Sequence, residues 1–317
     1  MPLSSFFEWC PCLLDIFLLI GLIFFLSIVG RFSYFIYCKF VRAPKDIYAV
    51  YGGPNTWAAV TGASDGIGKA FCEALAQRGF NICLIARNPE KLEKARQDIL
   101  NVNPKISTAI VVTDFSLGPK DPLNFFSKII EDMQKANVVD VAILVNNAGM
   151  IERGNFQDIS LKGCADSIAV NVYPSLFLSK LLIPSMLKRS NRSLVINLSS
   201  ITGVRPVPIR GAYGATKAFN DILARSLFME LDQKIDFLSV KPNYVSTNMT
   251  KMKVGGTVIR PIDVAEGALR DAGWQSATAG NWKHDVLEFL YKNVATDKMV
   301  ARSALKRREQ KEDAKID

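Results

Sequence analysis

Histidine is nearly absent from this chain of 317 residues, in which His284 is the single example. One imidazole excludes metal sites built from several histidines and argues against a Ser-His-Asp hydrolase. We expect His284 to have a structural or surface role rather than a catalytic one. Cysteine is scarce as well, with six residues and no pair in the C-x-x-C spacing of metal or redox sites. The sequence therefore predicts reduced thiols, no disulfide scaffold and no metal site.

Acidic residues are fewer than basic ones, 30 against 39, which gives a net charge of +9. Such an excess favours nucleic acid, an anionic membrane surface or a polyanionic ligand as a partner. The tail, residues 305–317, mixes charges of both signs and contains no aromatic residue, so it predicts no nucleic-acid interface. A composition of 49% hydrophobic and 22% charged residues also excludes a disordered or low-complexity chain.

Charge is absent from residues 16–30, and the apolar character extends from Trp9 to about Cys38, interrupted only by Asp15 and Arg31. A run of this length reaches the ~20 residues that a membrane span needs. The alternatives are a buried core helix and a cleaved signal peptide. Against the signal peptide, no Lys or Arg precedes the apolar core and no small-residue cleavage site is present. The run therefore predicts a transmembrane anchor, and the basic residues after it predict that the rest of the chain faces the cytosol.

Short apolar segments alternate with helical patterns through the remainder of the chain. The expected strands cover residues 57–61, 81–86, 107–112, 141–146, 193–198 and 236–242, and the expected helices cover 67–78, 89–101, 121–136, 160–189 and 211–232. Near-continuous apolar strands between helices indicate a parallel sheet that is buried on both faces, hence one doubly wound α/β domain. The expected organisation is a membrane anchor with its basic flank over residues 1–42, a linker over 43–54, the α/β domain over 55–282 and a polar extension over 283–317.

The turn after the first expected strand is rich in glycine. Gly62, Gly66 and Gly68 have the spacing G-x-x-x-G-x-G and lie directly between a strand and a helix. Glycines at such a turn let the backbone approach a pyrophosphate, whose charge is stabilised at the helix N-terminus. The same spacing alone is also compatible with an ordinary turn, so its position after the first strand is what predicts a dinucleotide site.

The ends of the next two strands refine the prediction of the cofactor. An acid at the end of the second strand would bind the ribose 2′-hydroxyl of NAD, but this strand ends in Arg87. A guanidinium suits a 2′-phosphate and favours NADP, whereas a solvated surface arginine is the alternative. Asp65, an acid within the glycine-rich turn, does not support that preference. Asp114, just past the third strand, is a candidate partner of the adenine amino group or a simple helix cap.

A second group of residues indicates carbonyl chemistry. Tyr213 and Lys217 are four residues apart in an expected helix, so they lie on one helix face. A lysine beside a tyrosine lowers the pKa of the phenol, which makes the pair a plausible acid and base. Ser200 precedes Tyr213 by thirteen residues at the end of a strand, where its hydroxyl can hold a substrate oxygen, and Ser199 is the other candidate serine. Asn171 lies in the expected helix between them, where an asparagine ordinarily faces solvent or bonds back to the chain.

The order TGASDGIG, NNAG, Asn171, Ser200 and YGATK resembles the short-chain dehydrogenase/reductase superfamily over roughly residues 55–250. The resemblance implies a Rossmann fold in which Tyr213 donates a proton to the substrate carbonyl and Ser200 orients the substrate oxygen. It also implies that Lys217 binds the nicotinamide ribose and depresses the pKa of the tyrosine, while Asn171 supports a proton-relaying water. The residues that it assigns to the cofactor are Gly62, Ser64, Asp65, Gly66, Ile67, Gly68, Arg87, Asp114, Asn147, Tyr213, Lys217, Val245 and Thr247.

A narrower resemblance is to the very-long-chain 3-oxoacyl-CoA reductase branch, whose members are also named 17β-hydroxysteroid dehydrogenases. It rests on GGPNTWAAVTGASDGIGKAF, LIAR, LVNNAGM and RPVPIRGAYGATKAF. The branch implies NADPH and an anchor in the endoplasmic reticulum. The chain departs from the pattern at Pro242-Asn243, where the superfamily has Pro-Gly, although Thr247 is retained. It also departs over residues 283–303, whose charges argue against a second membrane segment.

These observations favour an NADPH-dependent reductase that converts long-chain 3-oxoacyl-CoA to 3-hydroxyacyl-CoA in fatty-acid elongation. A membrane-bound hydroxysteroid or retinoid dehydrogenase is the alternative with the same chemistry. A nucleotide-binding scaffold without turnover is the alternative of another class, and the presence of Ser200, Tyr213 and Lys217 argues against it. By resemblance we also expect a lipophilic substrate, a homodimer formed through the helices over 160–189 and 211–232, and a place in an elongation complex.

Overall fold

The computed structural model describes residues 11–313, and it describes the side chains of residues 13–306. The chain forms two compact units, of which the first ends at Pro44 and the second begins at Lys45. Each unit is described by itself below.

The first unit is a long apolar helix. Helix α2 (Pro11–Ile36) continues into a short π-helix, η1 (Tyr37–Val41). Residues Leu13–Val41 form a candidate membrane span of 29 residues. At 1.5 Å per residue this span is roughly 40 Å long, more than the ~30 Å of a bilayer's hydrocarbon core. The N-terminal apolar helix predicted from the sequence is therefore present as a candidate anchor.

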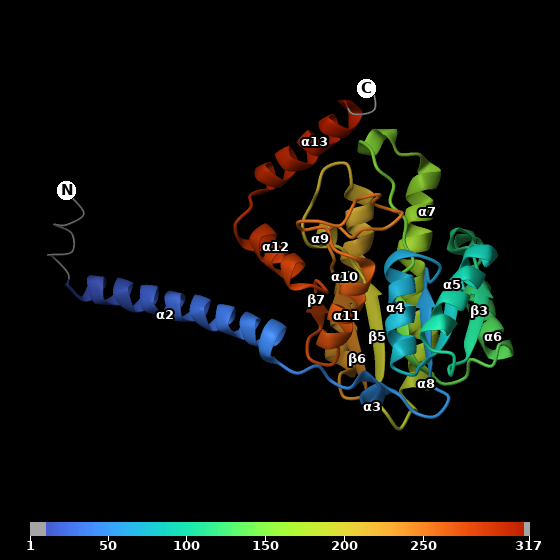
Figure 1. Ribbon diagram of the computed structural model, residues 1–317. Coiled ribbons are helices and arrows are strands. Elements are labelled where there is room, and N and C mark those ends of the chain that lie inside the picture. The colour runs from blue at the N-terminus through green and yellow to red at the C-terminus, as the bar shows by residue number, and fades with distance from the viewer. Residues whose placement is uncertain (1–10, 314–317) are drawn as a thin grey trace. The chain divides into compact units, whose positions relative to one another are not determined.

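The second unit is built on a parallel sheet (Figure 1). Its strands are β1 (Trp57–Thr61), β2 (Asn81–Ala86), β3 (Thr108–Val112), β4 (Val141–Asn146), β5 (Ser193–Leu198), β6 (Ile235–Val240) and β7 (Ala277–Thr278). They are arranged in the order β3-β2-β1-β4-β5-β6-β7, and every neighbouring pair is parallel. The chain thus winds outward from β1 in one direction and from β4 in the other. The carboxyl ends of β1 and β4 mark the switch point at which such folds bind ligands.

Helices cover both faces of this sheet, as the predicted doubly wound fold requires. One core layer packs the sheet against α4 (Gly66–Gln77), α5 (Pro89–Val102) and α11 (Pro261–Asp271). The other packs it against α6 (Pro122–Lys135), α8 (Tyr173–Met186) and α10 (Gly211–Leu231). Alternate residues of one strand enter opposite layers: Ile82 and Leu84 of β2 belong to the first and Cys83 to the second. Because both faces are buried, the strands are apolar throughout, which made them recognisable in the sequence. The predicted fold class is confirmed.

The helix predicted over residues 160–189 is wrong in one respect, since it is two helices. Helix α7 (Leu161–Asn171) ends before Val172, and α8 starts at Tyr173. Pro174 has no N–H to donate to the carbonyl four residues earlier, and its ring disfavours a continuous helix. The break leaves Asn171 at the end of α7, where the Asn220 side chain of α10 donates to its carbonyl at 2.9 Å.

Several elements were not predicted from the sequence. They are the short helices α3 (Ile47–Tyr51) and α9 (Ile201–Val204), the 3-10 turns η2 (Phe115–Lys120) and η3 (Phe156–Asp158), strand β7, and helices α11, α12 (Trp282–Asn293) and α13 (Asp297–Asp313). Helices α12 and α13 occupy the part of the chain that was expected to be a polar extension. Helix α12 belongs to the folded unit, because its His284 and Glu288 are buried.

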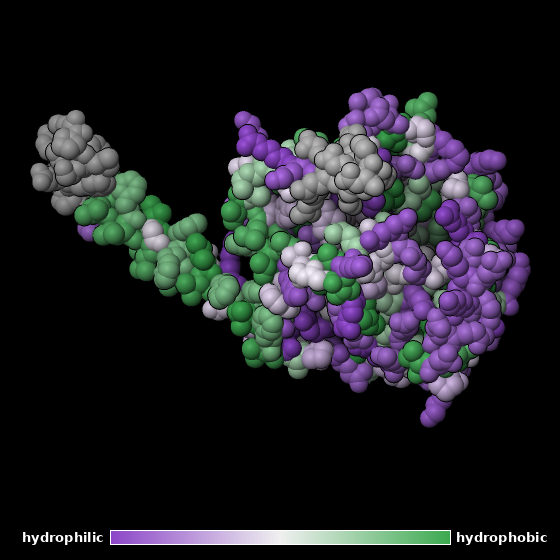
Figure 2. All heavy atoms as spheres, turned by 45° about the horizontal axis from the view of Figure 1, so that its top comes forward, coloured by the Kyte–Doolittle hydropathy of each residue, from purple (hydrophilic) through white to green (hydrophobic). Residues whose placement is uncertain are grey.

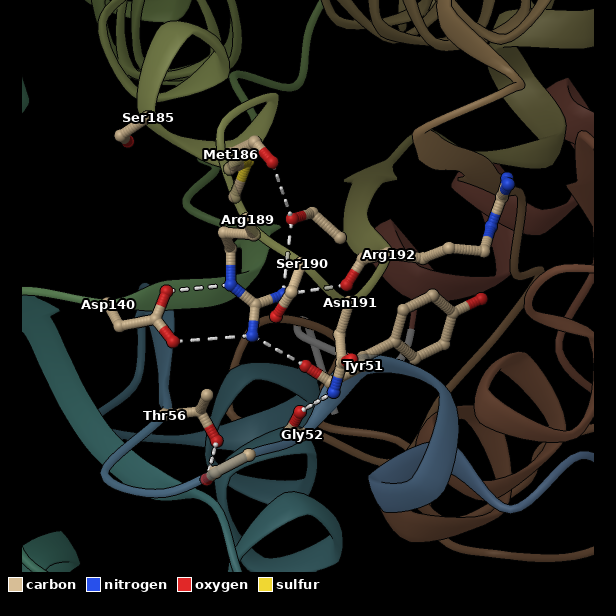
Figure 3. Close-up of polar contacts among 12 residues, drawn as sticks. Tyr51, Gly52, Thr56, Asp140, Ser185, Met186, Arg189, Ser190, Asn191 and Arg192 are labelled. Atoms are coloured by element: carbon tan, nitrogen blue, oxygen red, sulfur yellow. Dashed lines mark hydrogen bonds and ion pairs between the residues drawn. The ribbon is translucent and has the colours of Figure 1, made fainter.

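The segment predicted as a linker is bonded to the second unit through a polar cluster at the amino ends of the strands (Figure 3). The buried guanidinium of Arg189 pairs with both carboxylate oxygens of Asp140 at 2.6 and 3.3 Å. The same group donates to the carbonyl of Tyr51 at 2.9 Å, and the amide of Asn191 donates to the carbonyl of Gly52. These contacts attach residues 51 and 52 to the end of the sheet that is opposite the switch point.

Candidate active site

The glycine-rich turn joins β1 to α4 and has the geometry that its glycines permit. Gly62 and Gly66 have φ angles of +64° and +58°, a region that is costly for other residues. An ideal Cβ on Gly68 would lie 2.3 Å from the Gly62 carbonyl oxygen and 2.4 Å from the Asn147 side-chain nitrogen, so only glycine fits. The Asn147 amide donates to the carbonyls of Thr61 and Gly62 at 2.9 and 3.2 Å. Asn147, a predicted cofactor residue, thereby braces the turn.

The N-terminus of α4 lies at this turn, and Asp65 caps it. The Asp65 carboxylate accepts the N–H of Gly66 at 2.7 Å with one oxygen and the Asn248 amide at 2.5 Å with the other. Ser64 and Ile67 flank the cap and are partly buried. Because the carboxylate is engaged with groups of the chain, Asp65 shapes this end of the turn through contacts that the sequence did not predict. Its contact with the cofactor stays a prediction.

Arg87 and Asp114 lie at the ends of β2 and β3. The N–H of Gly62 donates to the carbonyl of Ile85 at 2.8 Å, so the glycine-rich turn is joined to the end of β2 close to Arg87. Arg87 is exposed, and it forms no ion pair within the described part of the chain. Asp114 caps the turn η2, where its carboxylate accepts the N–H of Ser116 at 3.0 Å. Asp114 therefore has the capping contact that was one of its two expected roles, and its contact with the adenine stays a prediction.

The loop that follows β6 packs against the glycine-rich turn. An ideal Cβ on Gly66 would lie 3.2 Å from the Thr247 methyl group, which brings Thr247 to the first turn of α4. Val245 is buried and its carbonyl accepts the Thr250 hydroxyl at 2.5 Å. His284 of α12 accepts the N–H of Asn243 at 3.1 Å and bonds the carbonyl of Thr257 at 2.9 Å. The single histidine thus holds both ends of this loop and has a structural role.

Lys217 is buried beneath the sheet's carboxyl edge. Its ammonium donates to the carbonyl of Leu198 at 2.8 Å and lies 5.8 Å from the centre of the Tyr213 ring. An ideal Cβ on Gly149 would lie 3.2 Å from this ammonium and 3.4 Å from the Asn171 side-chain oxygen, so the two groups converge beside Gly149. Burial lowers the pKa of Lys217 to about 8.

Asn171 is buried, and both the oxygen and the nitrogen of its side chain are hydrogen-bonded. Its oxygen accepts the N–H of Met150 at 2.7 Å. Its amide donates to the carbonyl of Met150 and to the Thr216 hydroxyl, both at 3.0 Å. Asn171 therefore joins the end of β4 to α10, the helix that carries Tyr213 and Lys217. The role that the resemblance gives it, support of a proton-relaying water, stays a prediction.

Tyr213 and Ser200 meet at the carboxyl end of β5. Burial raises the pKa of Tyr213, while a hydrogen bond with Ser200 and the charges of Arg210 and Arg153 lower it, and the net direction is upward. The charges that lower this pKa in this structure belong to the two arginines. The lowering by Lys217, which the resemblance implies, stays a prediction. Ser200 also accepts the Thr202 hydroxyl at 3.0 Å. Ser199 instead donates to the carbonyl of Lys217 at 2.6 Å, which engages it with α10.

A pocket adjoins this pair, and its walls come from segments far apart in the sequence. Thr202 of α9, Tyr244 of the loop after β6, Tyr291 of α12 and Val300 of α13 all line it. Arg205 lines it as well and joins the two C-terminal helices, since it bonds the Tyr291 carbonyl and pairs with Asp297 at 2.8 Å. Thr202, whose hydroxyl bonds Ser200, is the wall residue that connects this pocket to the pair.

Arg153 and Arg210 are the site residues that sequence reasoning missed. Arg210 donates to the Tyr244 hydroxyl at 3.2 Å, and Arg153 donates to the carbonyl of Met249 at 3.1 Å. Both act on the phenol of Tyr213 by their charge. Arg210 is three residues before Tyr213 and Arg153 follows the NNAG segment, so their proximity to two motifs was the available signal.

A parallel doubly wound sheet with a glycine-rich turn at its switch point defines a dinucleotide-binding protein of the Rossmann type. The sequence profile of the short chain dehydrogenase family matches residues 56–255. The chain belongs to the short-chain dehydrogenase family of oxidoreductases, and the predicted family is confirmed.

Two relatives with different names are similar to this chain over most of its length. The human protein named Inactive hydroxysteroid dehydrogenase-like protein 1 is 35% identical over 254 residues, which cover 78% of this chain and 73% of the relative. The Anas platyrhynchos protein named Very-long-chain 3-oxoacyl-CoA reductase is 33% identical over 250 residues, which cover 77% of each chain.

Solved structures share the fold. A 7β-hydroxysteroid dehydrogenase superposes with a TM-score of 0.70 at 22% identity, covering 82% of this chain and 99% of the other. An alcohol dehydrogenase of Thermococcus sibiricus, solved with 5-hydroxy-NADP, has a TM-score of 0.58 at 26% identity and covers 68% of this chain and 88% of the other. Neighbours of this fold therefore bind nicotinamide cofactors.

Proposed function

We propose that this protein is an NADPH-dependent reductase of long-chain 3-oxoacyl-CoA that forms 3-hydroxyacyl-CoA. The observation that carries the proposal is the pairing of the buried Ser200 with the partly buried Tyr213 beside Lys217, with the charges of Arg153 and Arg210 acting on the phenol. The arrangement supports reduction of a carbonyl on a negatively charged substrate. The relatives named very-long-chain 3-oxoacyl-CoA reductase support the same substrate.

In the proposed mechanism Ser200 and Tyr213 both bond the substrate oxygen. NADPH, when bound, supplies the hydride to the 3-carbon. Tyr213 keeps its proton at neutral pH because burial raises its pKa, and it gives that proton to the oxygen as negative charge develops there. The phenolate that remains is stabilised by Arg210 and Arg153. Lys217, on the same side of α10, holds the nicotinamide ribose.

The residues around the glycine-rich turn fit a dinucleotide. The absence of a side chain at Gly68 and the positive φ angles of Gly62 and Gly66 allow close backbone approach to a pyrophosphate. Arg87 is exposed at the end of β2 and forms an ion pair with no acid among the described side chains, which supports NADPH over NADH. Thr247, packed on Gly66, is the proposed partner of the carboxamide.

The charge of the loop after β6 supports a thioester of CoA, which carries several phosphate groups. Lys251 and Lys253 are exposed in this loop. Arg260, at the end of the same loop, pairs with Asp263 at 2.6 Å and is therefore less available to a polyanion. A neutral steroid would gain nothing from these cations, whereas a polyanion is attracted by them.

Two other functions have an observation in their favour. The relatives and the fold neighbour with hydroxysteroid in their names favour a membrane-bound hydroxysteroid dehydrogenase, of the 17β type in the branch that the sequence resembles. The relative named inactive favours a binding protein without turnover. The side chains of Ser200, Tyr213 and Lys217 are all present and close together, and this supports the enzyme.

The proposed location is the membrane of the endoplasmic reticulum, with the catalytic unit facing the cytosol. The apolar span Leu13–Val41 and the basic residues that follow it support this orientation. A homodimer through α7, α8 and α10, and membership of an elongation complex, belong to the same proposal. Exposed Leu176, Ile222 and Met229 on α8 and α10 are compatible with such an interface.

The test is NADPH oxidation by the detergent-solubilised full chain at two ionic strengths. We expect kcat/KM for a long-chain 3-oxoacyl-CoA to exceed that for an oxosteroid, and we expect the advantage to shrink as salt screens the charge. The same acyl chain on N-acetylcysteamine, which lacks the phosphates, should react more slowly and without salt dependence. Tyr213→Phe should retain NADPH binding and lose roughly 10³-fold or more in turnover.

The matched control compares two double variants. One carries both Lys251→Ala and Lys253→Ala, and the other carries both Lys128→Ala and Lys188→Ala, at exposed lysines on α6 and just after α8. Only the first pair should lower kcat/KM for the CoA thioester. A higher kcat/KM for a steroid, or equal effects of the two lysine pairs, contradicts the proposed substrate. No turnover with any carbonyl, combined with intact NADPH binding, supports the binding protein instead.

A further inference from the structure

Helix α12 buries polar side chains, whereas a surface helix usually buries its apolar face. Glu288 is buried and bonds the buried ammonium of Lys241 at 2.7 Å. His284, one turn earlier, is fully buried between Asn243 and Thr257. These contacts fix which face of α12 is turned to the protein.

The outer face of the same helix is apolar and exposed. Trp282, Val286, Phe289 and Leu290 have the spacing i, i+4, i+7 and i+8, so they form one stripe. Phe289 is 55% exposed, and the stripe continues past the helix to Val294, which is 61% exposed. Figure 2 shows apolar residues gathered along the left margin of the catalytic unit, the side on which Figure 1 places α12. A surface helix of a protein surrounded by water ordinarily has the opposite orientation.

Basic residues border this stripe. Lys283 lies on α12 and Lys298 lies at the start of α13, and both are exposed. Lys292, also exposed on α12, pairs with Glu288 at 2.5 Å and adds less to the positive charge. The exposed acid in the same stretch, Asp297, is paired with Arg205 at 2.8 Å. An exposed apolar stripe with a positively charged border matches the headgroup region of an anionic bilayer.

We propose that the outer face of α12, together with Val294 and Met299, docks on the surface of an anionic lipid bilayer. The contact is in addition to the N-terminal span and does not depend on which substrate the enzyme reduces. A second copy of the chain is the competing occupant. A second copy docked on this face would bring Lys283 and Lys298 close to the same positive residues of the first, which is unfavourable, whereas anionic headgroups neutralise them.

Docking in this way has a consequence for substrate entry if the proposed function holds. Tyr291 of α12 and Val300 of α13 line the pocket beside Thr202. Helix α12 therefore has the pocket on one side and the apolar stripe on another. A lipophilic substrate then passes from the bilayer to the pocket around α12 without crossing water.

The experiment measures quenching of Trp282 by brominated lipid in the full-length chain reconstituted in vesicles. Trp9→Phe and Trp274→Phe leave two tryptophans, Trp282 and the buried Trp57, which serves as an internal control. In vesicles of phosphatidylcholine and phosphatidylserine with bromine near the headgroup, we expect about half of the Trp282 emission to be lost. Phosphatidylcholine alone should quench less, and salt should reduce the difference. Trp282→Phe in the same background gives the signal of Trp57.

The stripe variant carries both Phe289→Ser and Leu290→Ser. The control carries both Leu123→Ser and Val139→Ser, two apolar residues elsewhere on the unit that are more exposed than the stripe residues. Circular dichroism confirms that each variant is folded. Quenching that falls only in the stripe variant supports the contact. The proposal is overturned if Trp282 is not quenched or if both variants behave alike. It is also overturned if Trp282 is shielded within a dimer that the stripe variant abolishes.

Discussion

Burial moves the pKa values of Tyr213 and Lys217 in opposite directions, because it disfavours the charged form of each. It raises the pKa of the phenol and lowers the pKa of the ammonium to about 8. At neutral pH the phenol therefore keeps its proton and the lysine is still mostly charged. This is the combination that a reductase needs, a proton donor together with a positive group for the ribose.

The pKa of Lys217 predicts a pH dependence. The folded pKa lies below the ordinary value for lysine, so the charged form is present below about pH 8 and is lost as the pH rises above about 8. We expect kcat/KM for reduction to decline above about pH 8, approaching roughly tenfold per pH unit. Lys217→Arg should be less active but flat over this range, since a guanidinium stays charged. A wild-type profile that is flat between pH 7 and about 9 would exclude Lys217 as the titrating group.

Arg87 predicts the cofactor preference. Arg87→Asp should raise the Kd of NADPH roughly tenfold or more and change that of NADH much less, because an acid repels a 2′-phosphate and can bond a ribose hydroxyl. Lys94→Asp on α5 is the control, as it makes the same change of charge at another exposed position. Titration of cofactor fluorescence measures both constants. Equal weakening of the two cofactors would remove Arg87 from the site.

At the level of elements, α12 connects the loop after β6 to the core. His284 holds that loop at Asn243 and Thr257, and Glu288 pairs with Lys241 immediately before it. The loop in turn bonds the glycine-rich turn through Asn248 and Asp65. The two halves of the site are thus linked through one helix near the C-terminus.

This linkage makes Glu288 important for stability. Glu288→Ala should lower the free energy of unfolding by about 3 kcal/mol, because it leaves the buried ammonium of Lys241 without a counter-charge. Lys292, the other partner of Glu288, is half-exposed. Lys292→Ala should therefore lower the free energy of unfolding by less than about 1 kcal/mol. Urea unfolding in detergent measures both. If the two variants lose similar amounts of unfolding free energy, the buried pair of Glu288 and Lys241 does not contribute more to stability than the exposed pair.

At the level of the whole molecule, the proposed orientation in the membrane rests on the basic residues that follow the N-terminal span. Three Asn-x-Ser/Thr acceptors test it, at Asn191, Asn197 and Asn248. Asn197 is buried in β5 and is uninformative in the folded protein, whereas Asn191 and Asn248 are exposed.

We expect none of these acceptors to be glycosylated in membrane-expressed protein, because in the proposed orientation they face the cytosol. An acceptor placed in an extension before Met1 should be modified, because the proposed orientation puts that end in the lumen. Glycosidase treatment followed by a mobility measurement distinguishes the two. A mass shift at Asn191 or Asn248 would reverse the orientation.

Periodicity and spacing predicted the framework of this protein from the sequence. The bounds of β1, β2, β4 and β5 agree with the expected strands, since a strand buried on both faces is apolar at every position. The glycine-rich turn and the spacing of Tyr213 and Lys217 were also visible, because each depends on residues that are close in the chain. Even the break between α7 and α8 had a local signal in Pro174, which the prediction of one long helix overlooked.

Tertiary structure alone decided the features that depend on contacts between distant segments. Arg153 and Arg210 act on Tyr213 only because the segment after β4 and the segment before α10 meet at the end of the sheet. The charges of α12 suggested a solvated polar extension, but His284 and Glu288 point inward, where partners from other segments satisfy them. A polar residue is stable inside a protein when it is hydrogen-bonded, and its sequence neighbours do not reveal that partner. The inward polar face in turn leaves the apolar stripe of α12 outside.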